Sequence, residues 1–302
     1  MPFDAHCHVV KDISHLLNND NFQYCAIMGT HPVECQQLLT LPTHNHILIG
    51  LGFHPWQVDQ YEYNESHYIQ QIESNKFNFI GEIGVDKVAT NPSGVKYDFN
   101  KQKKIFTSLF LLACKYQLPV SIHCARAYGY LFDFLKSLEC INDNISNRQR
   151  KKMQVEHYDL DSSSSSDNEE LAIENHVQHM KQCKSPLCQL DYKITPRIML
   201  HSYSGSPETT QQLLNLSFSN SLYFSFSAII NKRSVKKFEY AMRNIPINRI
   251  LLESDIHIEE ELIPLMNEIV DMVATTLKLN KSQVIDFALH NGKEFYNIEQ
   301  DS

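Results

Sequence analysis

Short runs of apolar residues alternate with longer amphipathic segments along most of this chain. Eight of the runs have the length and the flanking residues that are typical of buried β-strands. They are residues 3–10, 24–29, 47–53, 79–86, 118–123, 197–203, 222–227 and 249–255.

Between most of these strands, apolar residues recur at the three- and four-residue steps of a helix. The predicted helices begin near Pro32 or cover residues 64–76, 97–117, 128–138, 207–216, 233–244, 259–277 and 282–295. Eight strands that alternate with helices predict an α/β protein with the (β/α)8 fold, a TIM barrel. In that fold the carboxyl ends of the strands gather at one face, where active sites lie.

The alternating pattern stops before the sixth strand, between residues 141 and 195. This segment contains five consecutive serines and an acidic stretch, and it buries too little to offset its ordering entropy. We therefore expect one barrel domain over residues 1–302, interrupted at 141–195 by a disordered acidic, serine-rich insertion. The basic residues at 148–152 are a candidate nuclear-import signal, although a solvated charge run is the simpler interpretation.

Composition places the chain among ordinary globular proteins. Of its 302 residues 42% are hydrophobic and 21% are charged, and the formal net charge is −8. Seven of the negative charges lie within residues 156–174, a stretch without Lys or Arg, so the chain outside that stretch carries a net charge of −1. They are Glu156, Asp159, Asp161, Asp167, Glu169, Glu170 and Glu174. Because the rest of the chain is nearly neutral, its charge does not favour general binding of polyanions such as nucleic acids. The charge also does not argue against a substrate that is held by metal ions.

No apolar run approaches the roughly 20 residues that a membrane-spanning helix needs. The first residues also lack the basic-then-apolar order of a signal peptide. We therefore expect no membrane association and a location in the cytoplasm or the nucleus.

Histidines and acidic residues close several of the apolar runs. His6 and His8 lie two apart in the first run, so both side chains point to the same side of a strand. A single His-x-His pair is weak support for a metal site, but four more strands end in a comparable residue. The full set is His6, His8, Glu82, His123, His201 and Asp255.

Six ionisable groups crowded at one barrel mouth would repel or desolvate one another unless cations compensated them. Two divalent metal ions that share a carboxylate satisfy this requirement, and such a pair binds phosphate oxygens and activates a bridging water. We expect Glu82 to be the bridging ligand. His6, His8 and Asp255 complete one ion in this hypothesis, and His123 and His201 complete the other. Asp255 is the candidate to take the proton from the water, so Glu82 and Asp255 are the predicted catalytic residues.

The order of these motifs resembles that of the TatD-type metal-dependent deoxyribonucleases. The motifs are Asp4-Ala5-His6-Cys7-His8, Gly52-Phe53-His54-Pro55, Gly81-Glu82-Ile83-Gly84-Val85-Asp86, Pro119-Val120-Ser121-Ile122-His123, His201-Ser202-Tyr203-Ser204-Gly205 and Leu251-Leu252-Glu253-Ser254-Asp255. The resemblance covers the chain from Phe3 to about Tyr296 without the insertion. It implies a TIM-barrel hydrolase that cleaves phosphodiester bonds in DNA with two divalent metals, Mg²⁺, Mn²⁺ or Zn²⁺. The insertion is similar to that of the fungal branch, whose implied partner is a cell-cycle protein of the anaphase-promoting complex.

The substrate contacts that the resemblance implies are His54, Arg126, Ser204 and Gly205. The family commonly has an arginine at the position of Ala125, and here the arginine follows one residue later. The chain also departs from the family at three other places, where it has Lys87, Ile256-His257 and Trp56. Trp56 and Tyr203 are candidates to stack on bases, although aromatic residues beside an apolar strand more often belong to the core. None of these departures removes a predicted metal ligand.

Two other functions remain open at the level of the sequence. A histidine-rich barrel also hydrolyses small amides or lactones with the same activated water. Alternatively, the protein retains metal without useful catalysis and acts as a regulatory binding protein, with the insertion as its docking segment. The sequence leaves the native metal, the mode of DNA cleavage and the oligomeric state undetermined.

Overall fold

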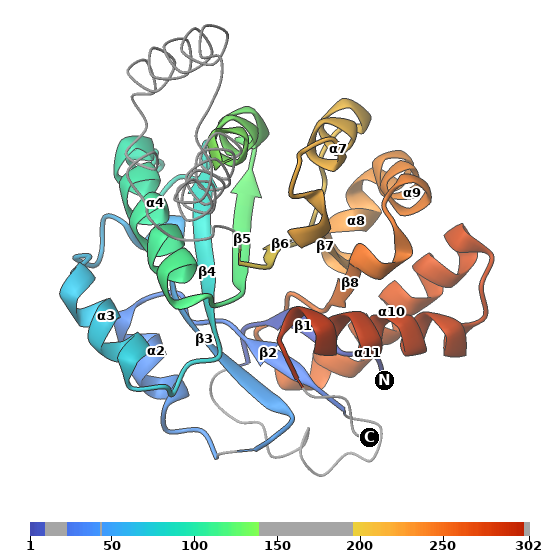
Figure 1. Cartoon of the computed structure of the whole chain (residues 1–302), viewed down its shortest axis with the longest axis horizontal. Coiled ribbons are helices and arrows are strands. Elements are labelled where there is room, and N and C mark those ends of the chain that lie inside the picture. The colour runs from blue at the N-terminus through green and yellow to red at the C-terminus, as the bar shows by residue number, and fades with distance from the viewer. Residues whose placement is uncertain (10–22, 43, 139–195, 299–302) are drawn as a thin grey trace, which may run out of the picture. The chain divides into compact units, whose positions relative to one another are not determined.

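A computed structural model describes residues 1–9, 23–42, 44–138 and 196–298. The chain divides into two compact units, Met1–Phe132 with Thr195–Ser302, and Asp133–Ile194. Within the first unit, eight strands form a nearly closed barrel with helices around it, which confirms the predicted (β/α)8 fold (Figure 1). The second unit is described only at residues 133–138, which are helical, so the insertion expected at 141–195 lies outside the described residues.

The strands pair in parallel and follow one another around the sheet in chain order. Their bounds are β1 Asp4–Cys7, β2 Cys25–Ile27, β3 Ile47–Phe53, β4 Phe79–Asp86, β5 Val120–Ala125, β6 Ile198–Leu200, β7 Leu222–Ser227 and β8 Ile250–Glu253. Every predicted apolar run coincides with one of these strands, although β5 extends two residues beyond the predicted run 118–123.

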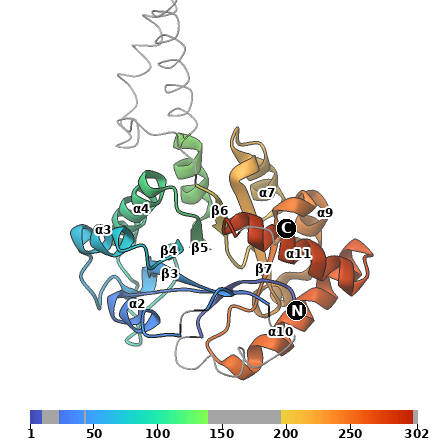
Figure 2. The same ribbon diagram turned by 60° about the horizontal axis from the view of Figure 1, so that its bottom comes forward.

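The helices follow the strands in turn (Figure 2). Among the described residues, the α-helices include α2 Pro32–Leu38, α3 Glu65–Glu73, α4 Phe99–Tyr116, α7 Pro207–Leu214, α8 Ala228–Asn231, α9 Val235–Asn244, α10 Glu259–Leu277 and α11 Lys281–Phe295. Residues 128–138 are also helical, and short 3₁₀ turns cover η1 Pro55–Gln57, η4 Ser219–Ser221, η5 Lys232–Ser234 and η6 Ile247–Arg249. Within the described ranges, no helix has the length and apolar character needed to cross a bilayer.

An aromatic cluster closes the barrel at the amino ends of the strands. The Phe3 ring stacks between those of Tyr24 and Tyr296, with centroids 5.4 and 5.5 Å away. Helix α11 reaches this cluster through Gly292, where a Cβ atom would lie 2.4 Å from a Phe3 ring carbon. Only glycine allows this approach, because real Cβ atoms do not come so close to a neighbour. The opposite end of the barrel is left for the polar residues.

Four strands, β1, β2, β6 and β8, end earlier than the sequence pattern predicts. The predicted strand 197–203 stops at Leu200, and the predicted strand 249–255 stops at Glu253. The backbone then turns through left-handed conformations at Ser202 (φ 41°) and Asp255 (φ 56°). Such φ values are uncommon for residues other than glycine, so a serine and an aspartate at these positions do not indicate that the strands end there.

A buried carboxylate joins the first strand to the last. Asp4 Oδ1 accepts hydrogen bonds from the backbone amides of Ser254 (3.0 Å) and His6 (3.3 Å). Its Oδ2 accepts a hydrogen bond from the Ser254 hydroxyl at 2.6 Å. A backbone bond from the Asp255 amide to the His6 carbonyl (3.0 Å) continues the seam. Asp4 therefore fixes two strands that both carry predicted metal ligands.

Replacing Asp4 with alanine should destabilise the fold, because it leaves the buried Ser254 and His6 amides without their acceptor. We expect the free energy of unfolding to fall by about 1–3 kcal/mol. Denaturant unfolding of Asp4→Ala measures this, with Asp59→Ala, at an exposed position, as the matched control. Equal midpoints for the two variants would contradict this role of Asp4.

Candidate metal centre

The structure brings all six predicted ligands together at the carboxyl ends of the strands. His6 lies on β1 and His8 follows that strand, Glu82 lies on β4, His123 on β5, His201 directly after β6, and Asp255 two residues after β8. Their side chains are at most 18% exposed. Six ionisable groups are thus buried in contact, an arrangement that requires compensating charge.

Glu82 sits at an irregular point of the sheet. The register between β4 and β5 shifts between Ile80 and Ile83, and the Glu82 amide donates to the Gly29 carbonyl at 2.9 Å. A Cβ atom at Gly52 would lie 2.1 Å from the Gly29 oxygen and 2.4 Å from the Glu82 nitrogen. Glycine at this position therefore lets β3 approach the irregularity, which aims the Glu82 carboxylate into the cluster.

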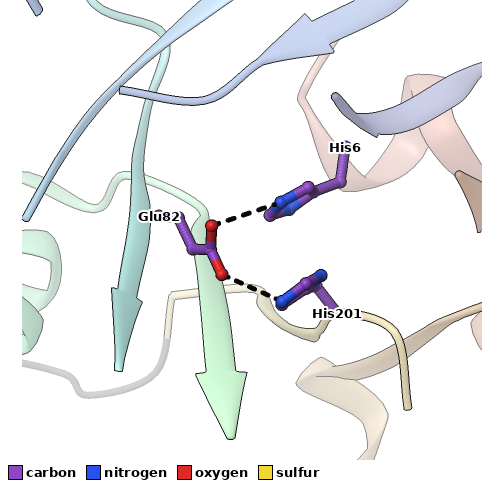
Figure 3. Close-up of side chains that lie close together, drawn as sticks. All are labelled: His6, Glu82 and His201. Carbon is purple, nitrogen blue, oxygen red and sulfur yellow. Dashed lines mark ion pairs between the residues drawn. The ribbon is translucent and has the colours of Figure 1, made fainter. Parts of the chain in front are cut away.

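The two oxygens of Glu82 face two different pairs of imidazoles. Oε2 lies 3.5 Å from His6 Nε2 and 3.4 Å from His8 Nε2. Oε1 lies 2.9 Å from both His123 Nδ1 and His201 Nε2. Figure 3 shows the division, with one oxygen directed at His6 and the other at His201. Glu82 is thus placed as a carboxylate shared between two sets of ligands.

The first set is formed by His6, His8 and Asp255. The two Nε2 atoms are 3.2 Å apart, and Asp255 Oδ1 is 3.9 Å from His6 Nε2 and 3.7 Å from His8 Nε2. Atoms bound to one zinc-sized ion at about 2.0–2.2 Å cannot be more than about 4 Å apart. All three separations meet this limit, so the set fits one metal ion.

The second set is formed by His123 and His201. His123 Nδ1 and His201 Nε2 are 3.1 Å apart, close enough to share one ion with Glu82 Oε1. Imidazole nitrogens with carboxylate oxygens suit zinc and several other divalent metals. The residue types and separations in both sets therefore fit metal ions.

Each of three candidate ligands has a buried polar partner on the ring nitrogen that faces away from the cluster. The pairs are His6 Nδ1 with Ser121 Oγ (2.9 Å), His201 Nδ1 with Glu253 Oε1 (3.3 Å) and His123 Nε2 with Asp86 Oδ2 (3.6 Å). The hydrogen bonds to His6 and His201 fix the orientation of a ligating imidazole. The contact between His123 and Asp86 is an ion-pair distance that is too long for a hydrogen bond. Ser121, Glu253 and Asp86 could not be assigned this role from the sequence, because the local pattern around each of them predicts a strand and nothing more.

The cluster strongly perturbs its own protonation. Burial opposes ionisation of Glu82, but the charges of His54 and His201 outweigh it and hold the pKa of Glu82 well below its ordinary value. Burial also opposes protonation of His201, yet Glu82 and Glu253 hold the pKa of His201 well above its ordinary value. Glu82 is therefore ionised at neutral pH, and protons and metal ions compete for the same imidazoles.

His54 lies against the shared carboxylate. Its Nδ1 accepts a hydrogen bond from the Trp56 amide at 3.2 Å, and burial lowers the pKa of His54 to about 4. A neutral ring that accepts at Nδ1 carries its proton on Nε2, which lies 3.4 Å from Glu82 Oε1. The N–H of His54 therefore faces Glu82, and its contact with substrate stays a prediction.

The other predicted substrate contacts lie at varied depths. Arg126 is exposed after β5, whereas the Ser204 amide donates to the Tyr128 hydroxyl at 3.1 Å. Gly205 is buried against Tyr203, since a Cβ at Gly205 would lie 2.2 Å from the phenol oxygen. Tyr203 is only 1% exposed, so it belongs to the core and is not available to stack on a base. Substrate contacts of Arg126, Ser204 and Gly205 stay predictions.

Comparison with known proteins places this site in a family. The family described as TatD related DNase matches residues 3–297 of the chain. The chain belongs to this family. The match extends over both sets of candidate ligands, and the chain is a metal-dependent hydrolase of the TatD type.

TatD relatives match the chain over nearly their whole length. The Cut9-interacting protein scn1 of Schizosaccharomyces pombe is 24% identical, and the match covers 98% of each chain. An uncharacterized deoxyribonuclease of Saccharomyces cerevisiae is also 24% identical, over 85% of this chain and 83% of the relative. The crystal structure of the TatD homologue YjjV from Escherichia coli superposes with a TM-score of 0.66 at 16% identity, over 98% of each chain. At that identity the structural likeness shows the fold alone.

Removing the hydroxyl of Ser121 should weaken metal binding, because His6 then loses the partner that orients its ring. We expect Ser121→Ala to lower metal affinity about 10- to 100-fold, measured by competition with a chromophoric chelator. The matched control is Ser225→Ala, since Ser225 is equally buried and its hydroxyl has no hydrogen-bond partner among the described residues. An equal loss of affinity in both variants would show that Ser121 does not act through His6.

Proposed function

We propose that this TatD protein is a deoxyribonuclease that hydrolyses phosphodiester bonds in DNA with two divalent cations. The observation that carries the proposal is the division of the Glu82 oxygens between two pairs of imidazoles, all within 3.5 Å. Two cations at such a shared carboxylate suit phosphodiester hydrolysis, because the attacking and the leaving oxygen both need stabilisation.

The proposed ligands follow from the two sets. His6, His8 and Asp255 hold the first ion with Glu82, and His123 and His201 hold the second with Glu82. When bound, the cations supply Lewis-acid stabilisation of the phosphate and lower the pKa of the attacking water. Mg²⁺, Mn²⁺ and Zn²⁺ are the candidates, because carboxylates suit the first two and imidazoles suit the third.

Asp255 is the proposed proton acceptor. Its side chain is 18% exposed, whereas those of Glu82 and Glu253 are 2% and 0% exposed, so Asp255 alone of these carboxylates reaches solvent. Burial opposes its ionisation, but the hydrogen bond from His8 and the neighbouring imidazole charges keep the pKa of Asp255 below its ordinary value. It is therefore ionised at neutral pH and accepts a proton from water in the mouth.

DNA as the substrate is supported by the names of the relatives. The family is described as a DNase family, and a budding-yeast relative is named a deoxyribonuclease. The name of the fission-yeast relative supports a second role, in which a Cut9-like protein binds this chain. The two roles do not exclude each other.

The deoxyribonuclease proposal predicts metal-dependent cleavage of DNA by the purified protein. We expect cleavage of labelled single- or double-stranded DNA with Mg²⁺, Mn²⁺ or Zn²⁺, and its loss with a chelator. Asp255→Asn should lower kcat about 10²- to 10⁴-fold, because the proton acceptor is removed. Asp59→Asn, at an exposed position, is the matched control and should cleave as the wild type does.

Two outcomes would overturn the proposal in favour of the other functions. Turnover of lactones or amides without cleavage of DNA would identify a small-molecule hydrolase. Metal binding without turnover of any of these substrates, in the wild type as in Asp255→Asn, would identify a binding protein.

A further inference from the structure

The tryptophan at the mouth of the barrel is unusually exposed for so large an apolar side chain. Trp56 lies in η1, directly after β3, and is 46% exposed. It is the sole tryptophan of the chain. Large aromatic side chains are mostly buried in a folded protein, and an exposed one beside a functional site therefore calls for an explanation.

Two hydrogen bonds hold Trp56 in place. Its indole Nε1 donates to Asp86 Oδ2 at 2.8 Å, and its backbone amide donates to His54 Nδ1 at 3.2 Å. Asp86 is itself buried, and its Oδ1 accepts from the backbone amides of Val88 and Ala89, both at 2.9 Å. The ring is therefore fixed by one edge before any ligand arrives, which reduces the entropy lost on binding.

The fixed ring lies next to the second set of candidate ligands. The Trp56 centroid is 6.1 Å from that of His123 and 4.9 Å from that of His54, with the ring planes close to perpendicular in both cases. Across the described ranges, no aromatic ring stacks in parallel on the indole. The exposed part of the ring is therefore free to take a flat ligand while His123 takes part in holding the reacting group.

Other large hydrophobic side chains are exposed in segments that follow strands of the barrel. In the described structure they are Val33, Val88, Val95, Val235 and Ile258, whereas Ile247 leads into β8. Trp56 is the one aromatic side chain among these exposed residues.

We propose that Trp56 stacks on a nucleobase next to the phosphodiester that the metal centre holds. The inference rests on the proposed function and adds a contact that binds the substrate beside the metal centre. The chain has a formal net charge of −8, and of −1 outside residues 156–174, so contacts with phosphate contribute little broad affinity. Stacking on an aromatic face supplies affinity that does not depend on charge or on base sequence.

Stacking also selects the form of nucleic acid. A base within a duplex already stacks on both neighbours, so only an unpaired base presents its face to an indole. Trp56 therefore favours single-stranded segments and frayed ends over intact duplex. Trp56 acts as a positioning residue on the bound nucleic acid, because it fixes a base while hydrolysis takes place at the adjacent phosphate.

The first test uses the fluorescence of the protein, because all tryptophan emission comes from Trp56. The wild type is titrated with a phosphorothioate-linked oligothymidylate, which resists cleavage, and with an abasic oligomer of the same length and charge. We expect the oligothymidylate to quench the emission and the abasic oligomer to leave it unchanged. Equal quenching by both, no quenching by either, or equal quenching by single strand and duplex would overturn the proposal.

The second test measures the energetic effect on single-stranded DNA. Trp56→Ala should raise Kd and KM about 5- to 150-fold, the equivalent of one lost base–aromatic stack, while Trp56→Phe retains most of the affinity. Ile247→Ala is the matched control, since Ile247 is 47% exposed, like Trp56, but leads into the amino end of β8. Thermal unfolding of each variant separates loss of stacking from loss of fold. An affinity unchanged in Trp56→Ala would overturn the proposal.

The outcomes for stacking and for catalysis are distinguishable. If the wild type cuts no phosphodiester, the proposed nuclease function fails, but quenching and Kd still decide whether Trp56 binds bases. If the wild type cuts DNA, Trp56→Ala should slow cleavage of oligothymidylate and leave the weaker cleavage of the abasic oligomer unchanged. Equal losses on both substrates would show that Trp56 acts on the metal centre and not on the base.

Discussion

The structure depends on one buried carboxylate, that of Glu82, whose oxygens serve two groups of imidazoles. A carboxylate and imidazoles packed at these distances are costly in a protein interior unless their charges are balanced. The sheet is adapted to this residue, since the irregularity in β4 and the absence of a side chain at Gly52 both bring the Glu82 backbone into place. The regular register of β4 is thus interrupted at the residue that the site needs, as expected where function constrains a fold.

The site and the closure of the barrel are physically linked. Asp4, buried beneath the cluster, joins the strand that carries His6 to the segment that carries Asp255. At the far end, Phe3 and Tyr296 close the barrel by ring stacking, and the Tyr296 hydroxyl donates a hydrogen bond to the Ala5 carbonyl. The amino ends of the strands therefore stabilise the fold by packing, and the carboxyl ends carry the polar site, which is the arrangement expected of a TIM barrel.

The sequence predicted the strands and the meeting of six ionisable residues at the barrel mouth, because apolar runs and their polar ends are local features. His6, Glu82 and His123 were found in this way. Their partners were not, because Ser121 and His6 are 115 residues apart in the chain and meet only through the fold.

The burial of an aromatic residue could not be predicted from its place after a strand, because it depends on contacts with distant parts of the chain. Trp56 and Tyr203 both follow an apolar strand, and the general rule favours the core for both. Tyr203 is 1% exposed and obeys it, whereas Trp56 is 46% exposed because the hydrogen bond to Asp86 holds its edge at the rim. The metal content of the purified protein, measured by elemental analysis, shows whether Glu82 is shared between two metal ions. We expect about two divalent ions per chain in the wild type and in Glu62→Ala, an exposed control, and at most one in Glu82→Ala. Fewer than two ions in the wild type, or two retained in Glu82→Ala, would contradict this expectation.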